Sequence, residues 1–387
     1  MDLFGEPDAP ATIETSDEAE AVADAMPEGL AHPREMTLCL GHDAIETALL
    51  DQINAGRMPH GLIFSGPKGI GKATFAYRLA RILLKHAAAD PNQNSMFADE
   101  LSAKLETMEI DPADPTFRQV ASGGHADLLT VEREYDAAKD TYKGSVAVDA
   151  IRKVNPFLRL TASKEGGWRV VIIDDADTMN RSAQNALLKI LEEPPANSVL
   201  ILICHRLGAM IPTIRSRTRT LSFAPLPKDN FERLLQMQGH SLAPTQLETL
   251  YHLSEGSAGV GLHYIEQGGL DTLDEILKLF NYTPSWPWPE IHKLADGLAR
   301  NGRDQSYQSF ALLMPWIFSQ MITAKARGQD IASAALHLEA IQRLHRQSSL
   351  ESLLKICENL KSHFDRVERS NLDKRQAVLG AFSIIAA

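Results

Sequence analysis

The chain has 387 residues, an apolar fraction of 44% and three cysteines that lie far apart. This length predicts two or three domains. No apolar run of about 18 residues occurs, which argues against a membrane span, and the start lacks a secretory signal. We therefore expect a cytoplasmic protein without disulfides or a cysteine-based zinc site. Ten acidic residues and one arginine within residues 1–35 account for −9 of the net charge of −11. The remaining chain is nearly neutral, so a local nucleic-acid contact is compatible with the charge, although no strong basic patch stands out.

The first part of the chain predicts an acidic tail and then a phosphate-binding element. Residues 1–32 are rich in Ala, Glu, Asp and Pro, a composition typical of disorder. The apolar segment 2–4 within them is either a docking motif or an unstructured start. Apolar spacing predicts a helix over 41–55, and a buried strand over 61–64 then enters a glycine-rich loop.

The middle of the chain alternates between strands and helices. Strands are predicted over 128–131, 169–173 and 198–204, and helices over 74–85, 148–160 and 183–192. This alternation predicts an α/β domain at 33–225, with a parallel sheet covered by helices on both faces. Strand signals end after Pro225, so we expect a small helical lid at 226–272 and a helical C-terminal domain at 273–387. Near the end, an apolar stripe follows helical spacing at Leu353, Ile356, Leu360, Phe364 and Val367.

The glycine-rich loop nearly matches the P-loop pattern GxxxxGK[ST]. The predicted nucleotide-binding residues are Gly66, Gly69, Gly71, Lys72, Ala73 and Thr74. Backbone N–H groups of such a loop and the following helix N-terminus bind phosphate oxygens, and the lysine contacts the β and γ phosphates. Ala73 stands where a Ser or Thr hydroxyl would coordinate Mg²⁺, and Thr74 is rotated about 100° from that position. We therefore predict weak ATP or ADP binding without useful hydrolysis. A chance glycine turn is the alternative.

A second acidic motif follows the predicted buried strand at 169–173. Asp174 is expected to hold a metal ion through a water, and Asp175 stands where a Glu usually orients the attacking water. The Asp side chain is one methylene shorter, and a misplacement of about 1 Å can cost on the order of 10²-fold in rate. Asp174 and Asp175 are thus predicted to form a degenerate Walker B motif. The alternative is that they cap the next helix.

Two further segments carry a resemblance to a known family. The segment NALLKILEEPP at 185–195 closely resembles a sequence shared by bacterial clamp-loader subunits, and IRSRT at 214–218 resembles their SRC motif, with Thr218 in place of Cys. The resemblance implies an AAA+ fold, in which Arg217 is an arginine finger that acts in trans on ATP held by a neighbouring subunit. The plain alternative is a surface arginine in a basic run with Arg215 and Arg219.

Several departures separate this sequence from the ATP-hydrolysing members of that family. Gly259 falls where their lid carries the sensor 2 arginine, and Cys204 and His205 occupy the sensor 1 region, in addition to Ala73 and Asp175. The resemblance then implies a subunit of the DNA polymerase III holoenzyme that lends an arginine but has weak or no ATPase activity of its own. Residues 88–130 contain no cysteine, whereas the family often has a four-cysteine zinc module there. We predict no zinc or other metal.

The resemblance also implies partners. These are the delta and tau/gamma subunits, the sliding clamp, and primer–template DNA through the assembled complex, with the C-terminal helices forming a collar and no membrane contact. Arg152 and Lys153 lie on a predicted helix that either faces DNA or is simply solvated. Two rival functions remain: an active AAA+ ATPase of the tau/gamma type or from another P-loop family, and a nucleic-acid-dependent AAA+ helicase.

Overall fold

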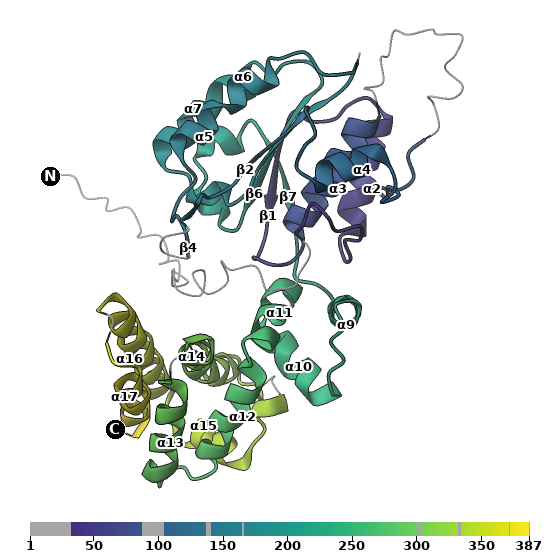
Figure 1. Cartoon of the computed structure of the whole chain (residues 1–387). Helices are drawn as coiled ribbons and strands as arrows, with labels where there is room; N and C mark the ends of the chain where they lie inside the picture. The colour runs from purple at the N-terminus through teal and green to yellow at the C-terminus, as the bar shows by residue number, and fades with distance from the viewer. Residues whose placement is uncertain are drawn as a thin grey trace, which may run out of the picture. The chain divides into compact units, whose positions relative to one another are not determined.

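A computed structural model describes residues 32–86, 104–136, 141–164, 166–300, 304–331, 334–370 and 372–386. The predicted tail at 1–32 therefore lies almost wholly outside the described residues. The chain divides into two compact units, one up to Glu266 and the other formed mainly by residues 267–331 and 336–386. Figure 1 shows the first as an α/β structure with helices at its end, and the second as helical throughout.

The first unit is built on a five-stranded parallel sheet with the order β2-β5-β6-β1-β7. Its strands are β1 (Gly61–Ser65), β2 (Leu128–Val131), β5 (Arg169–Ile173), β6 (Ser198–Cys204) and β7 (Arg219–Ser222). The central strands β5 and β6 are buried along their whole length, as a parallel sheet covered on both faces requires. In register, Ile63 of β1 lies opposite Leu202 of β6 and Thr220 of β7. The carboxyl ends of these strands therefore meet at one edge.

Alternate residues of the strands enter two separate cores, because successive side chains of a strand point to opposite faces. Phe64 and Ile172 pack with the helices of one face, and Ile63 and Ile173 pack with those of the other. Figure 1 shows helices on both faces of the sheet. The first face is covered by α2 (Asp43–Asn54), α3 (Lys72–Lys85) and α4 (Pro115–Ala121). The second is covered by α5 (Val148–Arg152), α6 (Val154–Leu158), α7 (Arg181–Glu192) and α8 (Pro212–Arg215). The predicted α/β fold is confirmed.

The prediction of one continuous helix over 148–160 was wrong. The segment forms two short helices, α5 and α6, which meet at Lys153. Pro156 has no backbone N–H to donate to the carbonyl of Arg152, so a regular helix cannot continue through it. The edge strand β7 and the small hairpin β3 (Tyr135–Asp136) and β4 (Thr141–Tyr142) were not predicted.

The remaining elements are helical, as predicted. Three helices complete the first unit: α9 (Lys228–Met237), α10 (Pro244–Leu253) and α11 (Ala258–Glu266). Short 3-10 turns are η1 (Ala176–Thr178), η2 (Leu207–Ala209) and η3 (Ala334–Leu336). The second unit contains α12 (Gly269–Phe280), α13 (Trp288–Leu298), α14 (Asp304–Arg327), α15 (Glu339–Gln347), α16 (Leu350–Arg369) and α17 (Lys374–Ala386). The predicted boundaries at 225 and 272 stay predictions.

The second unit has its own apolar core. Trp286 packs edge-on between Phe280 of α12 and Phe382 of α17, with ring centroids 5.2 and 5.3 Å away. The predicted stripe of α16 is confirmed: Leu353, Leu360, Phe364 and Val367 are buried, and Ile356 is half-buried. Among the described residues, none of the helices combines the length and the apolar character that crossing a membrane demands.

Candidate functional site

The predicted phosphate loop connects the buried strand β1 to the N-terminus of α3. Gly66, Gly69 and Gly71 all have positive φ angles, of 155°, 73° and 98°. A Cβ atom at Gly66 would lie 2.3 Å from the carbonyl oxygen of Phe223, so only glycine fits there. The structure thus brings the predicted residues together in a strand–loop–helix arrangement, with Lys72 as the first helical residue.

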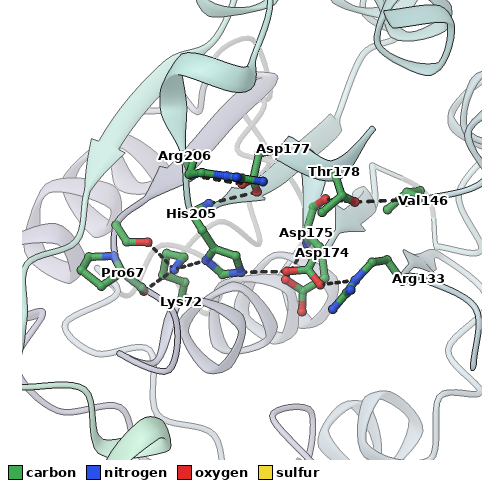
Figure 2. Close-up of polar contacts among 11 residues, drawn as sticks. Pro67, Lys72, Arg133, Val146, Asp174, Asp175, Asp177, Thr178, His205 and Arg206 are labelled. Carbon is green, nitrogen blue, oxygen red and sulfur yellow. Dashed lines mark hydrogen bonds and ion pairs between the residues drawn. The ribbon is translucent and has the colours of Figure 1, made fainter. Parts of the chain in front are cut away.

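The side chain of Lys72 forms hydrogen bonds within the protein (Figure 2). Its Nζ donates to the carbonyl oxygens of Gly66 and Pro67, at 2.6 and 2.5 Å, and to Nδ1 of His205 at 2.9 Å. An ammonium group has three N–H donors, and all three have acceptors here. The residue is 3% exposed, and this burial lowers the pKa of Lys72 to about 8 even though Asp174 and Asp177 act in the opposite direction.

His205 links this lysine to the acidic motif. Because the ammonium can only donate, Nδ1 of His205 accepts and its Nε2 carries the proton. That Nε2–H donates to Oδ1 of Asp175 at 2.7 Å, and the other carboxylate oxygen of Asp175 pairs with Nε of Arg133, also at 2.7 Å. Figure 2 shows the resulting chain Lys72–His205–Asp175–Arg133, which we call the internal polar chain.

The two predicted Walker B aspartates have different environments. Burial raises the pKa of Asp174 to about 6, with the charge of Asp175 as the second cause. Burial acts in the same direction on Asp175, but the hydrogen bond from His205 and the charge of Arg133 lower the pKa of Asp175 below its ordinary value. Asp175 also adopts a left-handed backbone conformation with φ of 48°. Both oxygens of its carboxylate are paired, one with His205 and the other with Arg133.

A third acidic residue, Asp177, secures the loop that carries His205. Its side chain is 1% exposed and accepts hydrogen bonds from the backbone N–H groups of His205 and Arg206, at 3.0 and 3.1 Å. The predicted alternative for Asp174 and Asp175 was helix capping. The helix α7 is instead capped by Asn180, whose side chain accepts from the N–H of Ala183. The aspartates are therefore part of the polar cluster at the strand ends.

The helix α11 closes directly onto the phosphate loop. The hydroxyl of Ser257 donates to the carbonyl of Lys68 at 2.7 Å, and the N–H of Gly259 donates to the carbonyl of Gly69 at 2.9 Å. A Cβ atom at Gly259 would lie 2.9 Å from the Cα of Gly69. With the loop and α11 in this arrangement, an arginine cannot occupy position 259. The departure from the sensor 2 pattern therefore has a packing reason.

These observations decide how well a magnesium nucleotide fits the residues present. The backbone of the loop has the shape that cradles phosphates. However, the Lys72 donors and the Asp175 carboxylate are already bound to the protein, and Ala73, which packs against the core beside β1, offers no oxygen to Mg²⁺. The side chains of this arrangement do not fit a magnesium nucleotide. Within the described residues, no cluster of three His, Cys, Asp or Glu side chains could hold a metal ion; the absence of zinc stays a prediction.

Arg217 lies away from this cluster. It belongs to the turn between α8 and β7 and lies next to the amino-terminal ends of β7 and β1. The phosphate loop follows the carboxyl-terminal end of β1. Its NH1 donates to the carbonyl of Thr213 at 3.0 Å, and its NH2 pairs with Oε1 of Glu192 at 2.9 Å. The Arg217 side chain is 36% exposed. The structure thus separates Arg217 from Lys72, Asp174 and Asp175.

The two predicted DNA-facing residues lie on the surface of the first unit. Arg152 is the last residue of α5 and pairs with Asp149 at 2.9 Å, and Lys153 follows it. Both are exposed, which suits both a contact with DNA and a solvated face. Their role stays a prediction.

The sequence did not single out Arg133 as a site residue, although a signal was present. β2 and β5 are parallel neighbours, with Val131 opposite Ile173. Two residues further along each strand, Arg133 and Asp175 therefore arrive at the same edge of the sheet. Recognising that pairing of the strands would have predicted the ion pair.

A P-loop on a five-stranded parallel sheet of this order, with helices on both faces and a helical remainder, defines the AAA+ class of P-loop folds. A sequence model of the family described as "DNA polymerase III, delta subunit" matches residues 41–227. This range covers the sheet, the internal polar chain and Arg217.

Curated relatives agree with this class. Replication factor C small subunit 2 of Pyrobaculum aerophilum is 27% identical over 228 residues, covering 58% of this chain and 57% of that protein. DNA polymerase III subunit gamma/tau of Mycobacterium tuberculosis is 32% identical over 203 residues, covering 52% and 31%. DNA polymerase III subunit delta' of Pseudomonas aeruginosa is 34% identical over 168 residues, covering 43% and 44%. The chain thus spans less than two thirds of the length of each of these relatives.

Among solved structures, a gamma subunit-related protein from Thermotoga maritima covers 87% of this chain and 98% of its own, at 14% identity and a TM-score of 0.40. The sequence matches are thus to clamp-loader proteins of the AAA+ class, and the family model covers a little under half of this chain.

Proposed function

We propose that this chain is the delta-prime subunit of a bacterial DNA polymerase III clamp loader. In this proposal it assembles with delta and tau/gamma subunits and helps them to load a sliding clamp onto primer–template DNA. Its own part is that of a stator, which lends Arg217 to ATP bound by the neighbouring tau/gamma subunit and does not hydrolyse ATP itself. This assembly would act in the cytoplasm, where chromosome replication takes place in bacteria.

The observation that carries the proposal is the distance between Arg217 and the chain's own phosphate loop. The two lie at opposite ends of β1, which has five residues. At about 3.3 Å per residue, that strand alone separates them by about 16 Å. An arginine side chain cannot span this distance through the sheet, so Arg217 cannot contact a nucleotide held by the chain's own phosphate loop.

The chemistry of Arg217 suits such a contact. Its guanidinium stays protonated at any physiological pH and presents planar N–H donors that match phosphate oxygens. Placed beside a transferring γ-phosphate, it offsets the charge that develops on the oxygens in the transition state. Its partial exposure leaves part of the guanidinium available to a neighbouring subunit.

The chain's own site supports the non-motor part of the proposal. Lys72 and Asp175 are bound into the internal polar chain, and Ala73 lacks the oxygen that a P-loop supplies to Mg²⁺. We therefore assign no hydrolytic step to this chain, and propose that it binds ATP or ADP weakly at most. The C-terminal helices would form the collar that holds the subunits together, and Arg152 and Lys153 would face DNA.

The test is a reconstituted complex of the full chain with delta, tau/gamma, the clamp and primed DNA. We expect Arg217→Ala to lower the DNA-dependent ATPase rate by about 10³-fold or more, as removal of an arginine finger does. Arg215→Ala is the matched control, since Arg215 is an exposed arginine two residues earlier. Undiminished activity of the Arg217→Ala complex would exclude the stator role.

The active-ATPase alternative gives the opposite result with the chain alone. It requires Mg²⁺-dependent ATP hydrolysis by the isolated protein and its loss on Thr74→Ala, since Thr74 is the nearest hydroxyl to the missing magnesium ligand. Hydrolysis with these two properties would replace the stator by a motor subunit.

A further inference from the structure

Arg217 has a partner that the proposed function does not use. Oε1 of Glu192, the last residue of α7, lies 2.9 Å from NH2 of Arg217, while NH1 of the same guanidinium donates to the carbonyl of Thr213. The guanidinium is thus held by a carboxylate from one element and a carbonyl from another. We propose that Glu192 is a positioning residue that orients Arg217 for the nucleotide of the neighbouring subunit. This inference rests on the finger role proposed above for Arg217.

The backbone is built to bring these two residues together. The end of α7 and the turn after α8 meet over Gly61, the first residue of β1. A Cβ atom at Gly61 would lie 2.9 Å from Cγ2 of Thr218 and 3.0 Å from Cδ2 of Leu191, so a side chain there would have to displace these two methyl groups. Gly61 therefore leaves room for the neighbours of Glu192 and Arg217, Leu191 and Thr218, to pack side by side over the start of β1.

Hydrogen bonds fix both segments in this approach. Nε2 of His60 is 3.2 Å from the carbonyl oxygen of Leu191, which ties the end of α7 to the start of β1. The hydroxyl of Thr218 donates to the carbonyl of Ile214 at 2.9 Å, which closes the turn that carries Arg217. The ion pair thus joins two segments whose backbones are held by hydrogen bonds.

The ion pair between Glu192 and Arg217 is not expected to add much to the stability of the fold. A carboxylate at the C-terminal end of a helix faces the negative end of the helix dipole and is locally unfavourable. The pair is also well exposed, at 36% for Arg217 and 51% for Glu192, and such pairs contribute little to folding. Glu193 is exposed at the same helix end, and within the described part of the chain it makes no such ion pair. Glu192→Gln is therefore expected to leave the fold intact, and Glu193→Gln is a matched control.

The direction of the effect follows from the flexibility of arginine. A long side chain loses rotational freedom when it engages a phosphate, and a group that is already held in place loses less. Two nitrogens of Arg217 are held by Glu192 and Thr213, which leaves the other donors for an incoming phosphate. Because a finger acts mainly in the transition state, poorer positioning lowers kcat and leaves the KM for ATP nearly unchanged.

The experiment uses the full chain in the reconstituted complex with primed DNA and clamp. We expect Glu192→Gln to lower kcat of the ATPase about 3- to 10-fold with an unchanged KM, and Glu193→Gln to match the wild type. In the Arg217→Ala background, Glu192→Gln is expected to cause no further loss, since its effect passes through the arginine. The melting temperature of the isolated chain and its recovery in the complex should be the same for the two glutamine variants.

Three results would overturn the inference. The first is a kcat for Glu192→Gln equal to or above that of Glu193→Gln. The second is an additive loss in the Arg217→Ala background, and the third is a defect confined to assembly. In each case a large loss with Arg217→Ala alone would leave the stator proposal standing. If Arg217→Ala kept full activity, the stator proposal would fail first, and the role of Glu192 with it.

Discussion

The charged residues at the two ends of the parallel strands have opposite environments. We call the carboxyl-terminal end, where they are paired and buried, the closed edge, and the amino-terminal end, where Arg217 lies, the open edge. At the carboxyl ends of the strands, Lys72, His205, Asp175 and Arg133 bind one another and are largely buried. At the other edge, Arg217 is 36% exposed and is held on two nitrogens by groups that leave part of it open. The first edge has the residue types of an ATPase but satisfies them internally. The difference teaches that a motif identifies the fold, whereas the partners of its side chains decide whether it is available for chemistry.

The largest effect is expected at the open edge, from Arg217→Lys. A lysine keeps the positive charge but loses the planar fork that matches a phosphate and Glu192 at once. We predict that the ATPase rate of the reconstituted complex falls by about 10²-fold or more, somewhat less than the loss with alanine because the positive charge remains. Arg219→Lys, at an exposed position two residues later, is the control. Near wild-type rates with Arg217→Lys would mean that charge alone matters and that the edge is not built for a shaped contact.

The second prediction concerns the closed edge. Lys72→Met removes three donors and leaves His205 and the carbonyls of Gly66 and Pro67 without them. We expect the free energy of unfolding of the isolated chain to fall by about 1–3 kcal/mol, because unpaired buried polar groups are costly. Urea denaturation would measure it, with Lys153→Met at an exposed position as the control. Unchanged stability would break the comparison, since it would mean that the lysine is not a structural part of the cluster.

A pH titration sharpens the same comparison. Burial raises the pKa of Asp174 to about 6 from 3.8, so between these values the folded protein holds a proton that the unfolded chain has released. Stability due to this group is therefore largest below about pH 4 and is lost as the pH rises to about 6. Asp174→Asn removes that decline and still accepts the N–H of Asp175.

We expect the variant to gain about 2–3 kcal/mol relative to the wild type between pH 4 and pH 7, at about 1.4 kcal/mol per pKa unit. Urea denaturation at a series of pH values measures this gain. Asp149→Asn, at a side chain that is 84% exposed, should show no such change. A flat difference for Asp174→Asn would show that Asp174 is ionised throughout.

The smallest effect is expected for the exposed basic residues of α5 and its end. If Arg152 and Lys153 each contact a phosphate, replacing either by Ala weakens DNA binding by the complex a few-fold. It also reduces the slope of log affinity against log salt by about 1. Binding measured at several salt concentrations decides between this and a solvated surface, for which neither quantity changes. Lys189→Ala on α7 serves as a comparison.

The fold was largely predictable because its signals are local. The strands at 169–173 and 198–204 are continuous apolar runs, and the structure has them at the predicted bounds. The edge strand β7 was missed, since its four residues are only partly buried and carry no such run. The prediction of a single helix at 148–160 was wrong because its apolar spacing is helical throughout, whereas Pro156 lacks the N–H that a continuous helix requires.

The site was predictable only as a set of residues. The loop from Gly66 to Lys72 and the aspartates at 174 and 175 were found from their spacing. Their state was not, because it depends on contacts between residues far apart in the chain, such as Lys72 with His205 and Asp175 with Arg133. The pairing of Glu192 with Arg217 also requires two segments to meet over Gly61, which no local pattern reveals.

The contact between Gly259 and Gly69 has a consequence for any attempt to engineer a working ATPase from this chain. Restoring a hydroxyl at position 73 alone would leave α11 seated on the loop, and adding an arginine at 259 alone would drive its Cβ into the Gly69 backbone. The arginine therefore cannot be restored by a single substitution. For an arginine at 259, α11 would first have to move away from the loop, which breaks the hydrogen bonds from Ser257 to Lys68 and from Gly259 to Gly69.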